Sequence, residues 1–183
     1  MNGTATLIGA IGSGQSVSDI AVLIERTVPT TISGDLRYAL TTGGSLISFD
    51  AAQPGIVRML VAVSGISAGQ VLSGLDFRPA TGELYALGYN SATGEARLYT
   101  LNLTTGAATA VGAAPITLAT NLGKIGFDFN PTVDRIRVTG SNNANYRLHP
   151  VTGVIAATDM NLAFAVTDVN AGGRHSRRTK RRV

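Results

Sequence analysis

The residues best suited to bind a ligand lie between positions 135 and 147 of the 183-residue chain. Side chains alternate between the two faces of a strand, so Arg135 and Arg137 share one face of the strand predicted at Arg135–Val138. Asn145 and Arg147 hold alternate positions in the next predicted strand. Because a guanidinium binds carboxylate, phosphate or sulfate through two parallel hydrogen bonds, these four residues predict a site for an anion or a glycan.

The aspartates of the chain allow a structural interpretation of the same segment. Asp128, Asp134 and Asp159 could pair with these arginines and seal an interface between neighbouring repeats. Asp76 and Asp128, with Asp19 as a third candidate, occupy one position of an internal repeat and could surround a cation such as Ca²⁺. An aspartate beside a turn more often accepts backbone N–H groups, and we predict this structural role for the three repeated aspartates.

No arrangement typical of a metal or cofactor centre is recognised in the sequence. The chain has no cysteine, and its only histidines, His149 and His175, lack the spacing of metal ligands. Carboxylates are few and dispersed, whereas acid–base catalysis needs a concentrated pair. We therefore predict no catalytic residue, no bound metal and no cofactor.

The chain repeats itself about every 50 residues. Glycines that precede one predicted strand of the unit recur at spacings of 52, 51 and 47 residues: Gly3, Gly55, Gly106 and Gly153. Other motifs recur in the same order, namely Gly74–Pro79 with Gly126–Pro131, Arg37–Leu40 with Leu84–Leu87, and Leu98–Leu101 with both Leu46–Phe49 and Asn145–Leu148. Several landmarks in one order indicate a true repeat.

Each unit contains four predicted strands of about five residues, separated by turns rich in Gly, Thr and Asn. This pattern predicts an all-β fold: a β-propeller-like array of four-stranded antiparallel blades of about 50 residues, with three to four blades in a closed or incomplete ring. We predict the following boundaries: a single repeat domain over 1–172, units at about 10–63, 71–112 and 123–158, partial-blade strands at Thr4–Ile8 and Leu162–Val166, a link at Pro115–Asn121, and a disordered basic tail over 173–183.

Tyrosines recur at strand positions of the repeat: Tyr38, Tyr85, Tyr99 and Tyr146. Aromatic rings can stack on sugars, but a ring at the same place in each unit is more typical of packing between blades. We expect these four residues to be structural.

Composition restricts the classes of partner. The chain is 44% hydrophobic and 14% charged, which is typical of a globular protein. Six of its 15 basic residues lie in 173–183, so the remainder has 15 − 6 = 9 basic and 11 acidic residues. A mildly acidic body predicts no nucleic-acid binding. No apolar run approaches the roughly 18 residues of a membrane helix, and no signal peptide is recognised.

Four segments of the repeat resemble the bacterial DUF4394 family: GLDFRPATGELYALG, RLYTLNLTTGAATAVG, GFDFNPTVDRIRV and NYRLHPVTGVIAATDMNLAFAVTDVNAG. The resemblance covers about Leu36 to Gly172 and implies a propeller-like fold without an assigned activity. In the family the stretch after DVNAG continues into further strands, whereas here it becomes RHSRRTKRRV, so we expect a truncated member. The resemblance also favours an extracellular or periplasmic location.

Three functional hypotheses follow. The first is a non-enzymatic binding or scaffold module for an unknown protein or glycan, because a rigid array with variable loops supplies what binding needs. The second is a propeller-type hydrolase or lyase acting on glycans or lactones. The third is a partial domain without independent activity, which self-associates through exposed blade edges. We favour the first.

Overall fold

The computed structural model describes residues 31–169 and residue 171. This part of the chain contains twelve β-strands and no helix, which confirms the prediction of an all-β protein. The predictions for Asp19, Thr4–Ile8, His175 and the whole basic tail, 173–183, lie outside the described residues.

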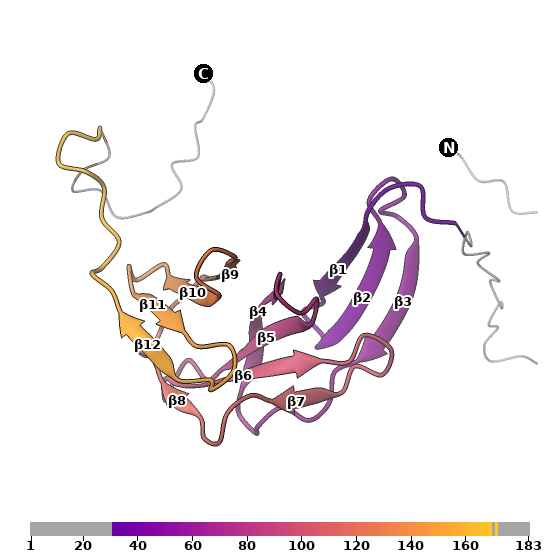
Figure 1. Ribbon diagram of the computed structural model, residues 1–183, viewed down its shortest axis with the longest axis horizontal. Helices are drawn as coiled ribbons and strands as arrows, with labels where there is room; N and C mark the ends of the chain where they lie inside the picture. Colours follow the sequence, from indigo (N-terminus) through magenta and orange to yellow (C-terminus); the bar gives the residue numbers. More distant parts are fainter. Residues whose placement is uncertain (1–30, 170, 172–183) are drawn as a thin grey trace, which may run out of the picture. The chain divides into compact units, whose positions relative to one another are not determined.

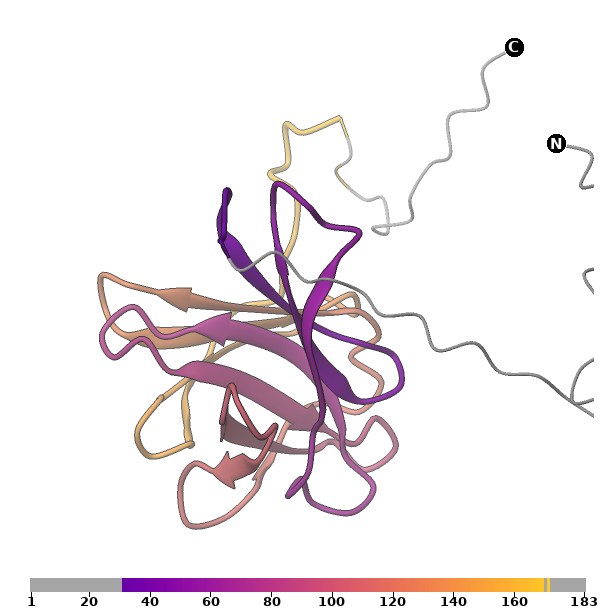
Figure 2. The same ribbon diagram turned by 90° about the vertical axis from the view of Figure 1, so that its right-hand side faces the viewer.

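The strands form three antiparallel sheets that follow one another along the chain (Figures 1 and 2). The first sheet has the order β1 (Leu36–Leu40), β2 (Ser45–Asp50), β3 (Val57–Ala62). The second has the order β4 (Val71–Phe77), β5 (Leu84–Tyr89), β6 (Glu95–Leu101), β7 (Ala108–Ala110), and β8 (Ile116–Thr117) also pairs with β6. The third has the order β12 (Ile155–Thr158), β11 (Asn145–Leu148), β10 (Arg135–Gly140), β9 (Ile125–Asn130).

Two segments differ from their predicted structure. Pro115–Asn121, predicted as a link, contains β8, which pairs with Glu95 and Ala96 at the start of β6. Leu162–Val166, predicted as a strand, does not form one. The Leu162 amide donates one hydrogen bond of 2.8 Å to the Asn143 carbonyl, and Val166 is 95% exposed. A strand requires a neighbour along its whole length, and nothing in the described residues supplies one here.

The hydrophobic core consists of two clusters, one on each face of the second sheet. Leu84, Ala86 and Tyr99 belong to the cluster that includes side chains of the first sheet. Leu87 and Leu98 belong to the cluster that includes side chains of the third sheet. Because both of its faces are covered, β5 is buried at every position, in contrast to a strand that has one face in water.

An edge-to-face aromatic pair joins each sheet to the next. The Tyr38 ring in β1 meets the Phe77 ring in β4 with 5.6 Å between ring centroids. At the equivalent position of the next repeat, Tyr85 in β5 meets Phe129 in β9 at 5.2 Å. This geometry is a preferred one for aromatic pairs, and its recurrence shows that the repeat specifies the contacts between sheets as well as the strands within them.

Tyrosine hydroxyls hold the links between sheets. The Tyr99 hydroxyl accepts a hydrogen bond from the Ser67 amide, and the Tyr146 hydroxyl accepts one from the Ala119 amide, both at 3.0 Å. Ser67 and Ala119 occupy equivalent places in the links that precede β4 and β9. Each tyrosine therefore satisfies a backbone donor of the segment that leads into its own sheet.

Turn glycines allow the sheets to approach closely at a second place. Gly106 and Gly153 have φ of +72° and +71°, and they precede β7 and β12. A Cβ atom on Gly153 would lie 2.6 Å from the Val111 carbonyl oxygen, and one on Gly106 would overlap the Ala62 carbonyl oxygen. Glycine is thus required there both by the left-handed backbone and by the neighbouring sheet.

Two polar contacts fix the third sheet to the second. The Phe129 amide in β9 donates a 2.8 Å hydrogen bond to Asp76 Oδ2 in β4. Beyond the strand ends, Arg78 Nε and Nη2 donate to Asp134 Oδ1 and Oδ2 at 3.0 Å and 2.6 Å. The Arg78 side chain is only 12% exposed, so this bidentate pair lies largely within the protein.

We predict that Asp76→Ala lowers the free energy of unfolding by about 1–2 kcal/mol, because it leaves the Phe129 amide without its acceptor. The matched control is Asp128→Ala. Asp128 holds the same repeat position but is exposed, and no ion pair or hydrogen bond of its carboxylate is found in the described residues, so we expect a change within about 0.5 kcal/mol. Urea unfolding of both variants tests this, and equal losses would contradict it.

The Arg78–Asp134 pair predicts a specific pH dependence. The hydrogen bond from Arg78 lowers the pKa of Asp134 below its ordinary value of 3.8. The folded state therefore binds this proton less readily than the unfolded state, and the stabilisation is complete above the ordinary pKa and is lost as pH falls through the folded-state pKa. We expect Asp134→Asn to lower the Tm at neutral pH and to match the wild type in strong acid.

Thermal unfolding of both proteins between about pH 2 and pH 7 measures this difference. Asp35→Asn is the control, because Asp35 pairs with Arg37 at 2.8 Å while 78% of its side chain is exposed, and exposed pairs contribute little. A Tm difference for Asp134→Asn that persisted unchanged into strong acid would show that the ion pair is not its cause.

Candidate functional site

The predicted ligand-binding residues lie on the two middle strands of the third sheet. In β10, Ile136 and Val138 are buried in the core shared with the second sheet, and Arg137 between them is exposed. In β11, Tyr146 and Leu148 belong to the same core. Because side chains alternate, Arg137 lies on the opposite face, and so do Asn145 and Arg147. We call this the outer face of the third sheet.

Two of the four predicted residues, Arg137 and Arg147, meet at one carboxylate, and a third, Asn145, bonds to Arg137. Arg147 Nε and Nη2 donate to Asp159 Oδ2 and Oδ1 at 2.9 Å and 2.7 Å. Arg137 Nη1 donates to Asp159 Oδ2 at 3.3 Å and to Asn145 Oδ1 at 2.6 Å. We call these four residues, Arg137, Asn145, Arg147 and Asp159, the Asp159 cluster.

Asn145 connects the cluster to the chain beyond β12. It is 8% exposed, and its Nδ2 donates to the Met160 carbonyl at 3.2 Å. The Asp159 amide in turn donates to the Asn145 carbonyl at 2.9 Å. Because the Met160 carbonyl holds Nδ2 of this side chain, Oδ1 is oriented toward Arg137 and restricts the position of that guanidinium.

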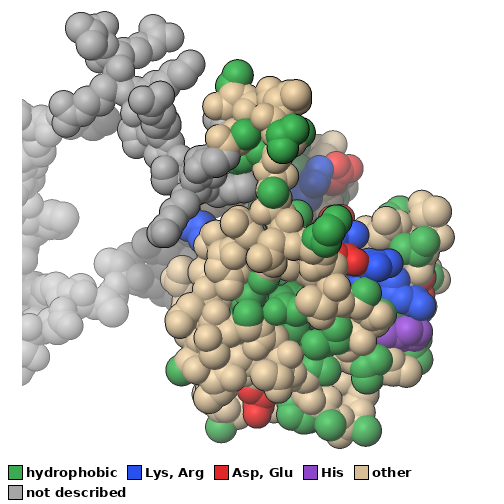
Figure 3. All heavy atoms as spheres, turned by 90° about the vertical axis from the view of Figure 1, so that its left-hand side faces the viewer, with side chains coloured by type: hydrophobic (Ala, Val, Ile, Leu, Met, Phe, Trp, Pro, Cys, Tyr) green, Lys and Arg blue, Asp and Glu red, His purple; other side chains and the backbone are tan. Residues whose placement is uncertain are grey.

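The two arginines are direct neighbours across the sheet. In the register of β10 and β11, Arg137 is paired with Arg147, and on the other side Arg137 is paired with Asp128 of β9. Like charges in directly opposite positions repel each other, and Asp159 offsets this repulsion by bonding to both. Figure 3 shows basic and acidic side chains gathered on one part of this side of the molecule.

The electrostatics of the cluster favour the ionised forms. The hydrogen bonds from Arg147 lower the pKa of Asp159 below its ordinary value, and the charge of Arg137 acts in the same direction. The hydrogen bonds to Asp159 raise the pKa of Arg147. The cluster therefore carries two positive charges and one negative charge at neutral pH.

Arg135 does not join the Asp159 cluster. Its Nη1 donates to the carbonyls of Val133 and Asp134 at 3.3 Å and 2.9 Å. Both acceptors belong to the turn that precedes β10, at the opposite end of that strand from Asn145. Arg135 thus supports its own turn, in which Asp134 has a positive φ of 47°.

The repeated aspartates do not come together around a cation in the described structure. Asp76 accepts amides of its own strand and of β9 through its two oxygens, at 2.8 Å each. Asp128 is exposed on the outer face of the third sheet. Among residues 31–169 and 171, no three His, Asp or Glu side chains are grouped so that they could hold a metal ion.

The pentapeptide Gly65–Gly69 matches the G-x-S-x-G pattern that surrounds the nucleophilic serine of many hydrolases. That serine requires a turn from a strand into a helix, whereas Ser67 lies in the link between β3 and β4. Its hydroxyl lies 3.0 Å from the Tyr99 hydroxyl, which in turn bonds to Gln70. Ser67 therefore has a structural partner in place of a catalytic histidine.

Comparisons with known proteins were made for the whole chain. No curated protein and no solved structure has significant similarity to it. In the part that the structure describes, no helix combines the length and the apolar character needed to cross a membrane. The model of one family, DUF4394, a domain of unknown function, matches residues 45–176, which is more than half of the 183 residues. This match confirms the resemblance found in the sequence, and the chain belongs to the DUF4394 family.

Proposed function

We propose that this chain is a non-enzymatic, propeller-like binding module, and that the outer face of its third sheet binds a carboxylate-bearing ligand. The propeller-like arrangement is supported by the recurrence of the contacts between sheets, in which each repeat offers its neighbour the same aromatic edge and the same turn glycine. Such an array is a rigid support for a binding surface.

The observation that carries the proposal is the pair of arginines that share one carboxylate. Arg137 and Arg147 are 45% and 44% exposed, while Asp159 is 23% exposed. A guanidinium has five N–H donors. Arg147 bonds to Asp159 through two of its nitrogens, Nε and Nη2. Arg137 bonds to Asn145 and Asp159 through one nitrogen, Nη1. Because both arginine side chains are nearly half exposed, their remaining donors are available to a second carboxylate.

The repeat indicates that this charge is a local specialisation. At the two equivalent positions of the second sheet the chain has Tyr85 and Thr100, which are paired across β5 and β6. Tyr85 is 4% exposed and packs on Phe129. Asp159 neutralises one of the two positive charges that replace this pair, and a ligand that neutralised the second charge would relieve the repulsion that remains between the arginines.

The proposal is tested with two polymers of known chemistry, polygalacturonate as a carboxylated glycan and poly-L-glutamate as an acidic polypeptide, and with neutral dextran for comparison. We expect binding of a carboxylated polymer that weakens as salt is added, and an affinity at least about tenfold lower for the double variant Arg137→Gln, Arg147→Gln, which corresponds to about 1.4 kcal/mol. Calorimetric titration measures both.

Arg37→Gln is the matched control, because Arg37 is also an exposed arginine on a strand with a single aspartate partner. Its affinity for the polymers should equal that of the wild type. If the double variant lowered the Tm but kept wild-type affinity, the arginines would be structural and the binding site would lie elsewhere. Absence of binding to both carboxylated polymers would also overturn the proposal.

A further inference from the structure

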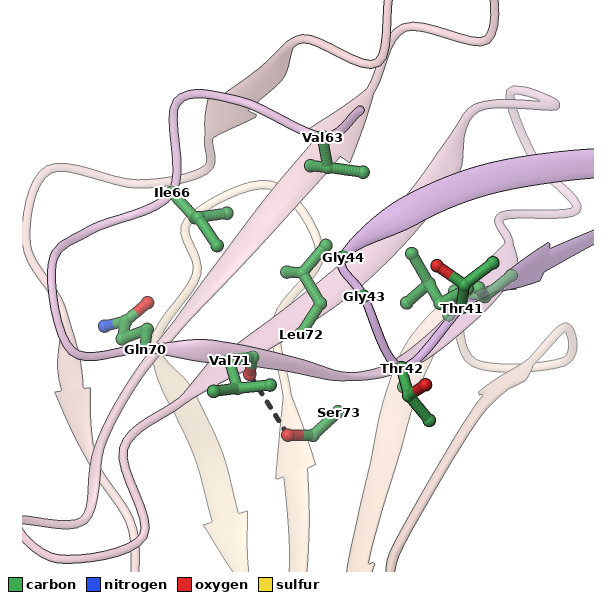
Figure 4. A pocket seen from close by; sticks show the side chains of 13 residues that line it. Thr41, Thr42, Gly43, Gly44, Val63, Ile66, Gln70, Val71, Leu72 and Ser73 are labelled. Atoms are coloured by element: carbon green, nitrogen blue, oxygen red, sulfur yellow. Dashed lines mark hydrogen bonds between the residues drawn. The ribbon is translucent and has the colours of Figure 1, made fainter. Parts of the chain in front are cut away.

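An open pocket of about 750 Å³ lies between the first and second sheets (Figure 4). The residues that line it come from β1 and the turn that follows it, the link between β3 and β4, and β4 itself, and they include Leu40, Thr42, Val63, Ile66, Gln70 and Leu72. Figure 4 shows Val63, Ile66 and Leu72 around one space beside the turn of Thr41–Gly44. The volume and the mainly apolar lining are typical of small-ligand sites, which span roughly 300–1,000 Å³.

The pocket results from a difference between two equivalent hairpins. In the first sheet, the strand pairing of β1 and β2 ends at Leu40 and Leu46. In the second sheet, the equivalent pair of Leu87 and Leu98 is followed by two further pairs, the last of which includes Tyr89. The first hairpin is therefore shorter, and its turn occupies the place where the second hairpin still has two strands.

Tyr89 fills the corresponding space of the next repeat. It is 5% exposed and belongs to the core between the second and third sheets. Its hydroxyl donates to the Ala119 carbonyl at 2.7 Å and accepts from the Leu122 amide at 3.2 Å. The phenol ring thus spans from the hairpin to the link that leads into β9.

The first repeat has an equivalent link, but its hairpin is shorter, and within the described residues no ring of that hairpin bonds to the link. Counted along the sequence from the match of Tyr38 with Tyr85, Thr42 corresponds to Tyr89, but in the shorter hairpin it is an exposed residue of the turn. The link residues equivalent to Ala119 and Leu122 are Ser67 and Gln70, where the Gln70 amide donates to the Ser67 carbonyl at 3.2 Å. A carbonyl oxygen accepts two hydrogen bonds, so this one can accept a second donor.

We propose that this pocket binds a para-substituted phenol ring from outside the chain, in the position that the Tyr89 ring has in the next repeat. The ring packs against Leu40, Ile66 and Leu72. Its hydroxyl donates to the backbone of the link at Ser67. This site is separate from the Asp159 cluster, since all its residues belong to the first two sheets and the link between them.

The test is a titration of the full chain with 4-ethylphenol, followed by two-dimensional NMR. We expect saturable shifts of the amides of Thr42, Ile66 and Leu72, and weaker binding of ethylbenzene, which lacks the hydroxyl. Thr42→Tyr returns the missing ring to the chain, and we expect it to raise the Tm and to weaken 4-ethylphenol binding at least about tenfold. Thr104→Tyr, in the exposed turn before β7, is the control and should bind like the wild type.

A second variant tests the equivalence of the two places if Thr42→Tyr fails to fold. Tyr89→Ala removes the ring from the next repeat, so this variant should bind a second equivalent of 4-ethylphenol and gain more Tm from it than the wild type does. N-acetyltyrosinamide distinguishes a tyrosine side chain of a partner protein from a free phenol as the natural occupant. If it binds more tightly than 4-ethylphenol, the occupant is a protein side chain. If it binds more weakly, the occupant is a free phenol. Absence of saturable binding to the wild type, or an unchanged affinity in Thr42→Tyr, would overturn the proposal.

Discussion

The hydrogen bond from the Phe129 amide to the Asp76 carboxylate holds the third sheet against the second. It joins the first strands of two sheets, at a place where Gly74 leaves room for Phe127. With β9 held in this way, the Phe129 ring meets Tyr85, and Ile136 and Leu148 enter the shared core. The arginines of β10 and β11 then have to lie on the outer face.

The repeat motifs made much of this fold predictable, because hydrophobic alternation and turn residues are local signals. The strand predicted at Arg135–Val138, for example, is β10, which begins at Arg135 and extends two residues further, to Gly140. Residues whose structure depends on a distant neighbour were harder: β8 exists because β6 offers Glu95 and Ala96 as partners, and Leu162–Val166 has no such partner. Alternation predicted that Arg135 and Arg137 share one face of their strand, but not that Arg137 and Arg147 are paired across β10 and β11 and meet at Asp159.

The two proposed sites share one principle, which is that a repeat acquires individual properties where it departs from its neighbours. Replacing Tyr85 and Thr100 of the second repeat by Arg137 and Arg147 in the third turns an apolar packing surface into a charged one. Replacing Tyr89 by Thr42 in a shorter hairpin leaves a space that the equivalent hairpin fills. In the first case the backbone architecture is retained and the side chains determine what the surface can bind, whereas in the second case the shorter hairpin changes the backbone as well.

The tyrosines have a consequence for spectroscopy. The chain has no tryptophan and five tyrosines, and each of the five makes one of the contacts between sheets or with the links that join them. The near-ultraviolet circular dichroism of this protein therefore reports mainly on the contacts between sheets and with the links, whereas the far-ultraviolet signal reports on the strands. An intermediate in which intact sheets had separated from one another would lose the first signal and keep the second.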